Sequence, residues 1–123
     1  MSKQTLIKNA KIVNEGQIIE GDILIEGNII KEIDTSISVK SADVNVIDVE
    51  GNHVFPGMID DQVHFREPGL THKANIETES KAAIAGGITS FIEMPNTNPQ
   101  TTTIEKLDEK FAIAAESSYA NYS

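Results

Sequence analysis

The sequence of 123 residues contains no cysteine, which excludes a disulfide framework and a zinc site with cysteine ligands. Basic residues are also few, since 10 Lys and Arg stand against 19 Asp and Glu, for a formal net charge of −9. Such an acidic balance disfavours nucleic acid or an anionic membrane as a partner. No apolar run approaches the ~20 residues of a membrane span, and no signal peptide is recognisable. We therefore expect a cytoplasmic protein without a nucleic-acid or membrane partner.

Residues 1–53 have the pattern of short β-strands separated by turns. Apolar pairs and triplets alternate with turn signals such as Glu15-Gly16 and Glu20-Gly21. The segment Glu26-Gly27-Asn28 lies between two apolar runs and predicts a hairpin in which glycine adopts a positive φ. We predict that this part of the chain forms a small antiparallel sheet, separate from residues 54–123.

Residues 54–123 have a different pattern, in which strand and helix signals alternate. Val54-Phe55 and Met58-Ile59 predict a first strand with an interruption between them, and Ile88–Met94 predicts a second strand. Asn75–Ala85 predicts a helix between the two strands, with Asn75 as its N-cap and Gly86-Gly87 as its stop signal.

A second helix and a third strand are predicted further along the chain. Thr102 and Glu105 have the spacing of a capping box, and Tyr119–Ser123 has the pattern of an opening strand. Apolar residues lie at helical intervals between them: Ile104, Leu107, Phe111, Ala114. Strands that alternate with helices predict βαβ units around a parallel sheet. Because a closed barrel of such units needs eight of them, we expect the chain to be a fragment or to complete its fold with other chains, and to be poorly folded alone.

Polar residues gather where the first of these strands ends. Gln62 and His64 are two positions apart, so they lie on one face of a strand. Two histidines at this spacing can hold one Zn²⁺, but an amide is a poor zinc ligand. Spacing alone favours the competing interpretation that His64 is a packed, hydrogen-bonded histidine. His53 and His72 have no partner at ligand spacing, and we expect both in exposed loops.

Arg66 and Asn96 are candidates for binding an anion. Arg66 continues the two-residue spacing of the preceding pair, which predicts the same face, and a guanidinium suits a bidentate grip on a carboxylate. Asn96 follows the second strand at the equivalent position, where its amide would donate to the same anion. Taken alone, Arg66 is better explained by a surface ion pair with Glu67 or Asp61, and Asn96 by a turn.

Four segments of the chain resemble dihydroorotases of the amidohydrolase superfamily. They are Phe55–Asp60, Val63–Lys73, Gly86–Thr89 and Met94–Thr97. Residues 1–50 resemble the N-terminal β-sandwich segment that precedes the barrel in that family. The resemblance implies an α/β fold, namely the N-terminal part of a metal-dependent (β/α)8 TIM barrel after a small β-sandwich segment.

The resemblance implies a zinc-dependent hydrolase that catalyses the reversible cyclisation of N-carbamoyl-L-aspartate to dihydroorotate in pyrimidine biosynthesis. Family members bind one or two Zn²⁺ ions, attack with a metal-bound hydroxide and use an aspartate from the last barrel strand as proton shuttle. That aspartate is expected beyond Ser123, so the resemblance implies that this chain contains no catalytic residue and is inactive by itself. The resemblance implies that His64 is a zinc ligand, and that His64, Arg66 and Asn96 contact the substrate. Arg66 and Asn96 would hold its carboxylate. A homo-oligomer is also implied.

Gln62 departs from the family pattern, which has histidine at this position. The departure leaves open a non-catalytic homologue that acts as a structural partner of aspartate carbamoyltransferase. Another cyclic amidohydrolase, such as an allantoinase or a hydantoinase, also stays open, although these generally lack the pairing of Arg66 with Asn96.

Overall fold

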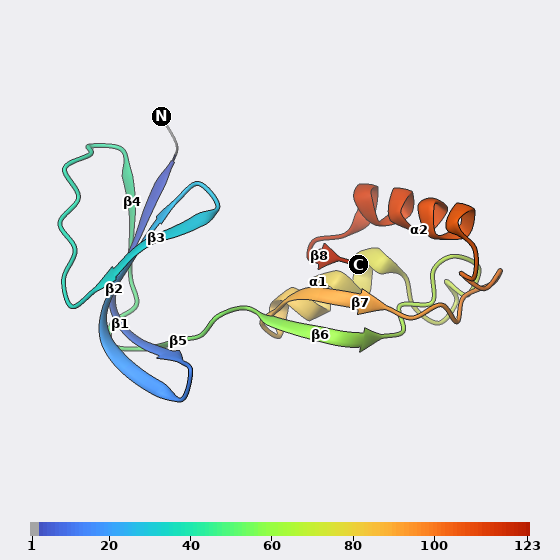
Figure 1. Ribbon diagram of the computed structural model, residues 1–123, viewed down its shortest axis with the longest axis horizontal. Coiled ribbons are helices and arrows are strands. Elements are labelled where there is room, and N and C mark those ends of the chain that lie inside the picture. The colour runs from blue at the N-terminus through green and yellow to red at the C-terminus, as the bar shows by residue number, and fades with distance from the viewer. Residues whose placement is uncertain (1–2) are drawn as a thin grey trace. The chain divides into compact units, whose positions relative to one another are not determined.

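The computed structural model describes residues 3–123, which fold into two compact units that adjoin in sequence at Pro56 and Gly57. The first unit is built on a five-stranded sheet, and the second on a three-stranded sheet with two helices (Figure 1). Neither helix in this described range is long and apolar enough to cross a membrane.

The first unit contains β1 (Gln4–Asn14), β2 (Gln17–Glu26), β3 (Ile29–Asp34), β4 (Val44–Asp48) and β5 (His53–Val54). The strand order is β3-β2-β1-β4, and β5 also pairs with β1. The predicted hairpin is confirmed, because β2 and β3 pair antiparallel across Gly27, where φ is 63°. The prediction of a fully antiparallel sheet is wrong, because β4 and β5 run parallel to β1. The connection after β3 returns the chain to the far side of β1, which the local sequence pattern does not encode.

Val54 belongs to the first unit, so its assignment to the first strand of the second unit is wrong. It lies in β5 and pairs with Ile12, while the neighbouring His53 pairs with Lys11. His53 is exposed as predicted, but in a strand rather than in a loop. Residues 55–57 then separate β5 from the next strand. A single apolar run is thus divided between two sheets, and hydrophobicity alone gives no sign of the division.

A buried carboxylate holds the first unit together where β1 is irregular. Asp22 is 3% exposed, and it accepts hydrogen bonds from the backbone N–H groups of Asn9 and Ile37, both at 3.0 Å. Asn9 lies at the register shift of β1 with a φ of 57°, a conformation that asparagine tolerates. Its side chain donates to both carboxylate oxygens of Asp48 and, together with the Glu50 amide, lowers the pKa of that carboxyl.

The second unit alternates strands and helices as β6 (Met58–Val63), α1 (Ile76–Ala85), β7 (Ile88–Glu93), α2 (Ile104–Ser117) and β8 (Asn121–Tyr122). The sheet order is β6-β7-β8, and both pairings are parallel. The predicted alternation, the parallel sheet and the short third strand are confirmed. Because these strands run in the same direction, the carboxyl ends of β6 and β7 lie at one edge of the sheet (Figure 1).

The helix boundaries follow local capping signals. The Asn75 side chain accepts from the Thr78 N–H at 2.8 Å, and a glycine C-cap ends α1, as predicted. The predicted capping box, which begins at Thr102, is wrong by one residue. The N-cap of α2 is Thr103, whose hydroxyl accepts from the N–H three residues on at 3.4 Å. Three consecutive threonines offer the same local signal, and the N–H groups of the first two donate to carbonyls of the preceding loop, at Pro95 and Gln100.

Both helices cover the same face of the three-stranded sheet. The core between them and the sheet contains Val63, Phe65, Ile76, Phe91, Ala114 and Ala120. Phe91 is 2% exposed, and its ring centroid lies 4.6 Å from that of Phe65. On the other side of β6 and β7, Ile59 and Ile92 are exposed. The core therefore decides which side chains of the strands point away from the helices.

We expect Phe91→Ala to lower the free energy of unfolding of the second unit by about 3–5 kcal/mol, because it removes a buried ring and leaves a cavity. Ile104→Ala is the control, since this side chain is 75% exposed, and it should change that free energy by less than about 0.5 kcal/mol. Urea unfolding of the complete protein measures both effects. Equal losses for the two substitutions would contradict the central place of Phe91 in the core.

Candidate functional site

The carboxyl end of β6 turns Gln62 and His64 away from the helices. Val63 and Phe65 are both 8% exposed and belong to the core. Gln62 and His64, which alternate with them, are exposed. Neighbouring side chains of an extended chain point to opposite sides, so these two polar side chains share the uncovered side of the strand.

A bulge in β6 lies just before this point. The stretch from Asp60 to Val63 on β6 faces the shorter stretch from Phe91 to Glu93 on β7, so β6 contains an extra residue. The Gln62 N–H donates to Asp60 Oδ1 at 3.1 Å across the bulge. Bulges re-aim the side chains that follow them and are frequent beside active sites. Asp60 therefore shapes the strand end through its carboxylate.

Arg66 lies beyond the end of β6, and its backbone is not extended. Its φ is 70°, and its carbonyl accepts from the Leu70 N–H at 3.1 Å. The prediction that Arg66 continues the face of the preceding pair is therefore wrong, because strand alternation ends at this turn. Within residues 3–123 the guanidinium makes no ion pair or hydrogen bond, and the carboxylate of Glu67 accepts from the Ile76 N–H instead. The competing ion pair of Arg66 is thus not formed.

His64 and Asn96 are brought together from two different strand ends. His64 Nδ1 lies 3.0 Å from Asn96 Oδ1, and both side chains are exposed. Because an amide oxygen only accepts, His64 donates from Nδ1, and in the neutral ring this tautomer has its lone pair on Nε2. The same bond leaves the NH₂ group of Asn96 to donate elsewhere. The contact therefore presents an amide donor and a nitrogen lone pair on one exposed edge.

The loops after β6 and β7 are joined by their backbones. The Met94 N–H donates to the Val63 carbonyl at 3.0 Å, and the Asn98 N–H donates to the Pro68 carbonyl at 3.1 Å. Gly69 lies at this junction with a φ of 84°, and a Cβ added there would overlap the carbonyl of Asn98. Glycine is required here by the backbone conformation and by the close approach. The two loops therefore form one continuous polar edge.

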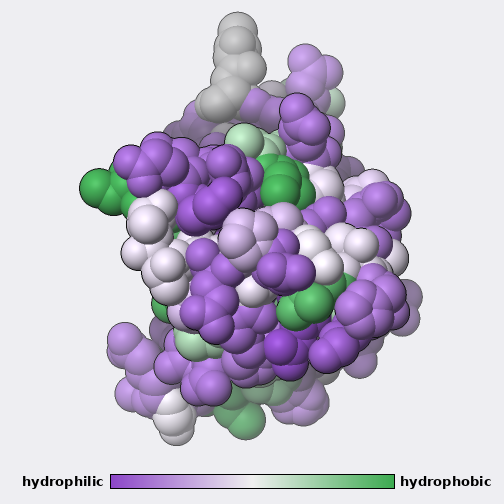
Figure 2. Space-filling view, turned by 90° about the vertical axis from the view of Figure 1, so that its right-hand side faces the viewer, coloured by the Kyte–Doolittle hydropathy of each residue, from purple (hydrophilic) through white to green (hydrophobic). Residues whose placement is uncertain are grey.

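Figure 2 shows the molecule from the side toward which β6 and β7 point in Figure 1. This face is mainly hydrophilic, and its hydrophobic side chains form separate spots. In open α/β sheets, ligands bind outside the carboxyl ends of the strands. A hydrophilic face at these strand ends suits a polar ligand.

Two buried charges near these loops escape prediction from the sequence pattern. Glu93 ends β7 and Lys110 lies on α2, with side chains 5% and 8% exposed and 3.4 Å between Lys110 Nζ and Glu93 Oε1. A signal for them was present. Glu93 is the only charge in the apolar run Ile88–Met94, and Lys110 has helical spacing to Leu107 and Ala114. A charge at a core position requires a buried partner.

The described residues do not make up a zinc site on their own. No group of three or more His, Cys, Asp or Glu side chains within residues 3–123 is placed to hold a metal ion. His64 offers one nitrogen lone pair, and the exposed Gln62 beside it offers only an amide. Zinc is held by at least three protein ligands in catalytic sites. At this strand end the described residues therefore supply one imidazole, which is not enough to bind zinc by itself.

The fold and the site define an α/β protein with polar, ligand-type side chains at the carboxyl ends of parallel strands. The model of the Dihydro-orotase-like family matches residues 51–122, and the chain belongs to this family. The matched range includes both loops of the candidate site.

Curated relatives and solved structures extend this result. The dihydroorotase of Staphylococcus epidermidis is 46% identical over 104 residues, which cover 85% of this chain and 24% of the relative. The dihydroorotase of Carboxydothermus hydrogenoformans is 50% identical over 96 residues, 76% of this chain and 22% of the relative. The L-hydantoinase (dihydropyrimidinase) structure from Arthrobacter aurescens is similar over 100% of this chain and 27% of its own, with a TM-score of 0.91 and 33% identity. The chain spans about a quarter of the length of the curated relatives it matches.

We expect Gly69→Ala to disrupt the joined loops, because alanine is strained at a φ of 84° and its Cβ would overlap the Asn98 carbonyl. Gly87→Ala is the matched control in the same unit, since φ is 90° and the nearest atom to the added Cβ is Met58 Cε at 3.8 Å. Each substitution carries the strain of a positive φ, about 1–2 kcal/mol. Only Gly69→Ala adds a backbone collision, so it should lower the melting temperature further. Equal shifts in thermal unfolding would contradict the close approach of the loops.

Proposed function

We propose that the chain forms the N-terminal part of a dihydroorotase, which interconverts N-carbamoyl-L-aspartate and dihydroorotate in pyrimidine biosynthesis. In this proposal the first unit belongs to a β-sandwich, and the second supplies the first βα units of a (β/α)8 barrel. Membership of the Dihydro-orotase-like family and identities of 46% and 50% to bacterial dihydroorotases support it. The parallel order β6-β7-β8, with both helices on one face, is the arrangement that such a barrel requires.

The observation that carries the proposal is the contact between His64 and Asn96, together with the unpaired guanidinium of Arg66. The contact orients the Asn96 amide so that its NH₂ group is left to donate. Arg66 follows His64 by two residues and has no partner within residues 3–123. A guanidinium and an amide donor without acceptors of their own suit a carboxylate.

The proposed role of Arg66 and Asn96 is to hold the carboxylate that stays unchanged in the reaction. Cyclisation forms a bond between the ureido nitrogen and the carbon of the other carboxyl group, and a water molecule leaves. Hydrolysis adds that water back and opens the same bond. A fixed carboxylate orients the nitrogen toward the carbon with which it reacts, which lowers the entropic cost of ring closure. Both residues thus act by binding and orientation.

We expect Arg66→Ala in the complete enzyme to lower kcat/KM for dihydroorotate by about 10- to 100-fold, because a hydrogen bond to a charged group contributes about 1.5–3 kcal/mol. Hydrolysis of 5,6-dihydrouracil, the same ring without the carboxylate, should change by less than about threefold. Arg66→Lys is the control, since it keeps the charge but loses the bidentate geometry. Its kcat/KM for dihydroorotate should lie between the values of the wild type and Arg66→Ala. An unchanged kcat/KM for dihydroorotate in Arg66→Ala would sink this role.

The presence of Gln62 favours a second candidate function. The proposal assigns His64 to the zinc site of the complete enzyme, through the lone pair on Nε2, and places the other ligands outside the described residues. An amide at Gln62 removes one expected imidazole. A homologue without zinc would act as a structural partner, in a complex with aspartate carbamoyltransferase, rather than as a catalyst.

Metal analysis of the purified complete protein distinguishes these two candidates. We expect stoichiometric zinc, and we expect His64→Asn to weaken zinc binding by more than about tenfold, as loss of a direct ligand should. Gln62→Ala is the control and should leave the zinc content unchanged, because an amide is a poor zinc ligand. Absence of zinc together with absence of turnover would favour the non-catalytic partner.

The similarity to L-hydantoinase, with a TM-score of 0.91, favours a third candidate, a hydrolase for cyclic ureides without a carboxylate. This candidate assigns no anion to Arg66 and Asn96. Faster turnover of hydantoin or 5,6-dihydrouracil than of dihydroorotate by the wild-type enzyme would support it against the first proposal.

A further inference from the structure

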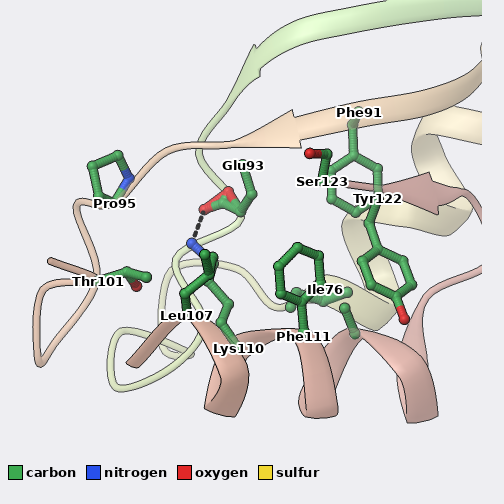
Figure 3. Close-up of a pocket in the computed structure, with 11 residues that line it drawn as sticks. Ile76, Phe91, Glu93, Pro95, Thr101, Leu107, Lys110, Phe111, Tyr122 and Ser123 are labelled. Atoms are coloured by element: carbon green, nitrogen blue, oxygen red, sulfur yellow. Dashed lines mark ion pairs between the residues drawn. The ribbon is translucent and has the colours of Figure 1, made fainter. Parts of the chain in front are cut away.

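Glu93 and Lys110 form a buried ion pair at the carboxyl end of β7. Figure 3 shows Lys110 extending from α2 toward Glu93, in a pocket that is otherwise lined mainly by apolar side chains such as Phe91 and Phe111. The side chains are 5% and 8% exposed, and Lys110 Nζ lies 3.4 Å from Glu93 Oε1. Two well-packed apolar residues are often as stable as a buried ion pair. Stability alone therefore does not account for the pair.

The carboxylate of Glu93 holds the loop after β6. Both of its oxygens accept from the Phe65 N–H, at 3.1 and 3.2 Å. Phe65 stands between His64 and Arg66 in the sequence, and its ring is fixed in the core. The hydrogen bond thus fixes the backbone from which both candidate substrate-binding side chains project.

The ammonium group of Lys110 holds the loop after β7. Its Nζ donates to the Met94 carbonyl at 2.9 Å, two residues before Asn96. Each member of the ion pair therefore holds one of the two loops. The attraction between Glu93 and Lys110 links the loop after β6 to the loop after β7. The 3.0 Å contact between His64 and Asn96 depends on the spacing of these same loops.

We propose that Glu93 and Lys110 are positioning residues that set the distance between the loop of His64 and Arg66 and the loop of Asn96. This inference rests on the proposed function, because it assigns the pair to the same carboxylate-binding site. Both side chains are buried, so they act through the backbones that they hold. An ion pair that only stabilised the core would alter unfolding and leave recognition of the carboxylate unchanged.

Lys110→Met in the complete enzyme removes the charge and the hydrogen bond to the Met94 carbonyl while it keeps a long side chain. We expect about a tenfold rise in KM for dihydroorotate with kcat within about threefold. In the hydrolytic direction the ring is already closed, so carboxylate binding is lost equally from the ground state and the transition state. KM for 5,6-dihydrouracil should stay unchanged. Ser80→Ala is the control, since this buried hydroxyl bonds the Tyr119 N–H at 3.1 Å and the Glu77 carbonyl at 3.2 Å.

Ser80→Ala should lower the melting temperature and leave KM for dihydroorotate at the wild-type value. The double variant Glu93→Gln with Lys110→Met removes both charges and keeps an acceptor for the Phe65 N–H. We therefore expect KM for dihydroorotate in the double variant to lie between the values of the wild type and Lys110→Met, since the two residues act as one unit. A wild-type KM in Lys110→Met, with only the melting temperature lowered, would overturn the proposal.

Hydrogen exchange of the complete protein provides a readout that does not require turnover. Lys110→Met should speed exchange of the Phe65 amide and its neighbours in residues 62–70 more than Ser80→Ala does. If dihydroorotate is not a substrate but exchange rises only in Lys110→Met, the proposed function fails and the positioning role stands. Equal exchange in the two variants would reject the positioning role, whatever the substrate.

Discussion

The burial of Val63 and Phe65 beneath the two helices is the constraint on which the candidate site depends. Both side chains join the core of the second unit, with the Phe65 ring 4.6 Å from that of Phe91. Because side chains alternate along an extended chain, this burial turns Gln62 and His64 to the uncovered side. A slip by one residue would bury both polar side chains and expose Phe65, at a large hydrophobic cost. The core thus sets the facing of the polar side chains that a ligand would meet.

The contact between His64 and Asn96 is exposed, and an exposed hydrogen bond by itself stabilises a structure only modestly. The geometry of this contact is instead fixed by interactions within and beneath the two loops. The backbones of the two loops are bonded directly, Gly69 permits their close approach, and the buried pair of Glu93 and Lys110 holds one loop with each of its charges. The relative position of the two loops is therefore set mainly by residues that a ligand would not touch.

Local signals made part of this structure predictable. The Asn75 cap and the glycine stop define α1 because both act within one turn of the helix. The parallel pairing of β4 with β1 was not predictable, since it joins Gln4 to Val44 and depends on the whole path of the chain. His64 and Asn96 could be chosen by their places after strands. The turn at Arg66 was missed, because a positive φ at a non-glycine residue is imposed by surrounding contacts. Glu93 and Lys110 were missed because charges are usually assigned to the surface.

The candidate site combines side chains suited to a carboxylate with side chains suited to a metal, and the amide of Gln62 weakens only the second group. The donors suited to a carboxylate, Arg66 and Asn96, both lie within the described residues, whereas these residues supply only one imidazole for a metal. His64 belongs to both parts, because Nδ1 orients the Asn96 amide and Nε2 keeps its lone pair. With histidine at position 62, a second imidazole would stand beside it. With glutamine there, the proposed metal binding at this strand end would depend on His64, which also contacts Asn96. In the proposed function, recognition of the anion and binding of the metal would therefore be coupled through the ring of His64.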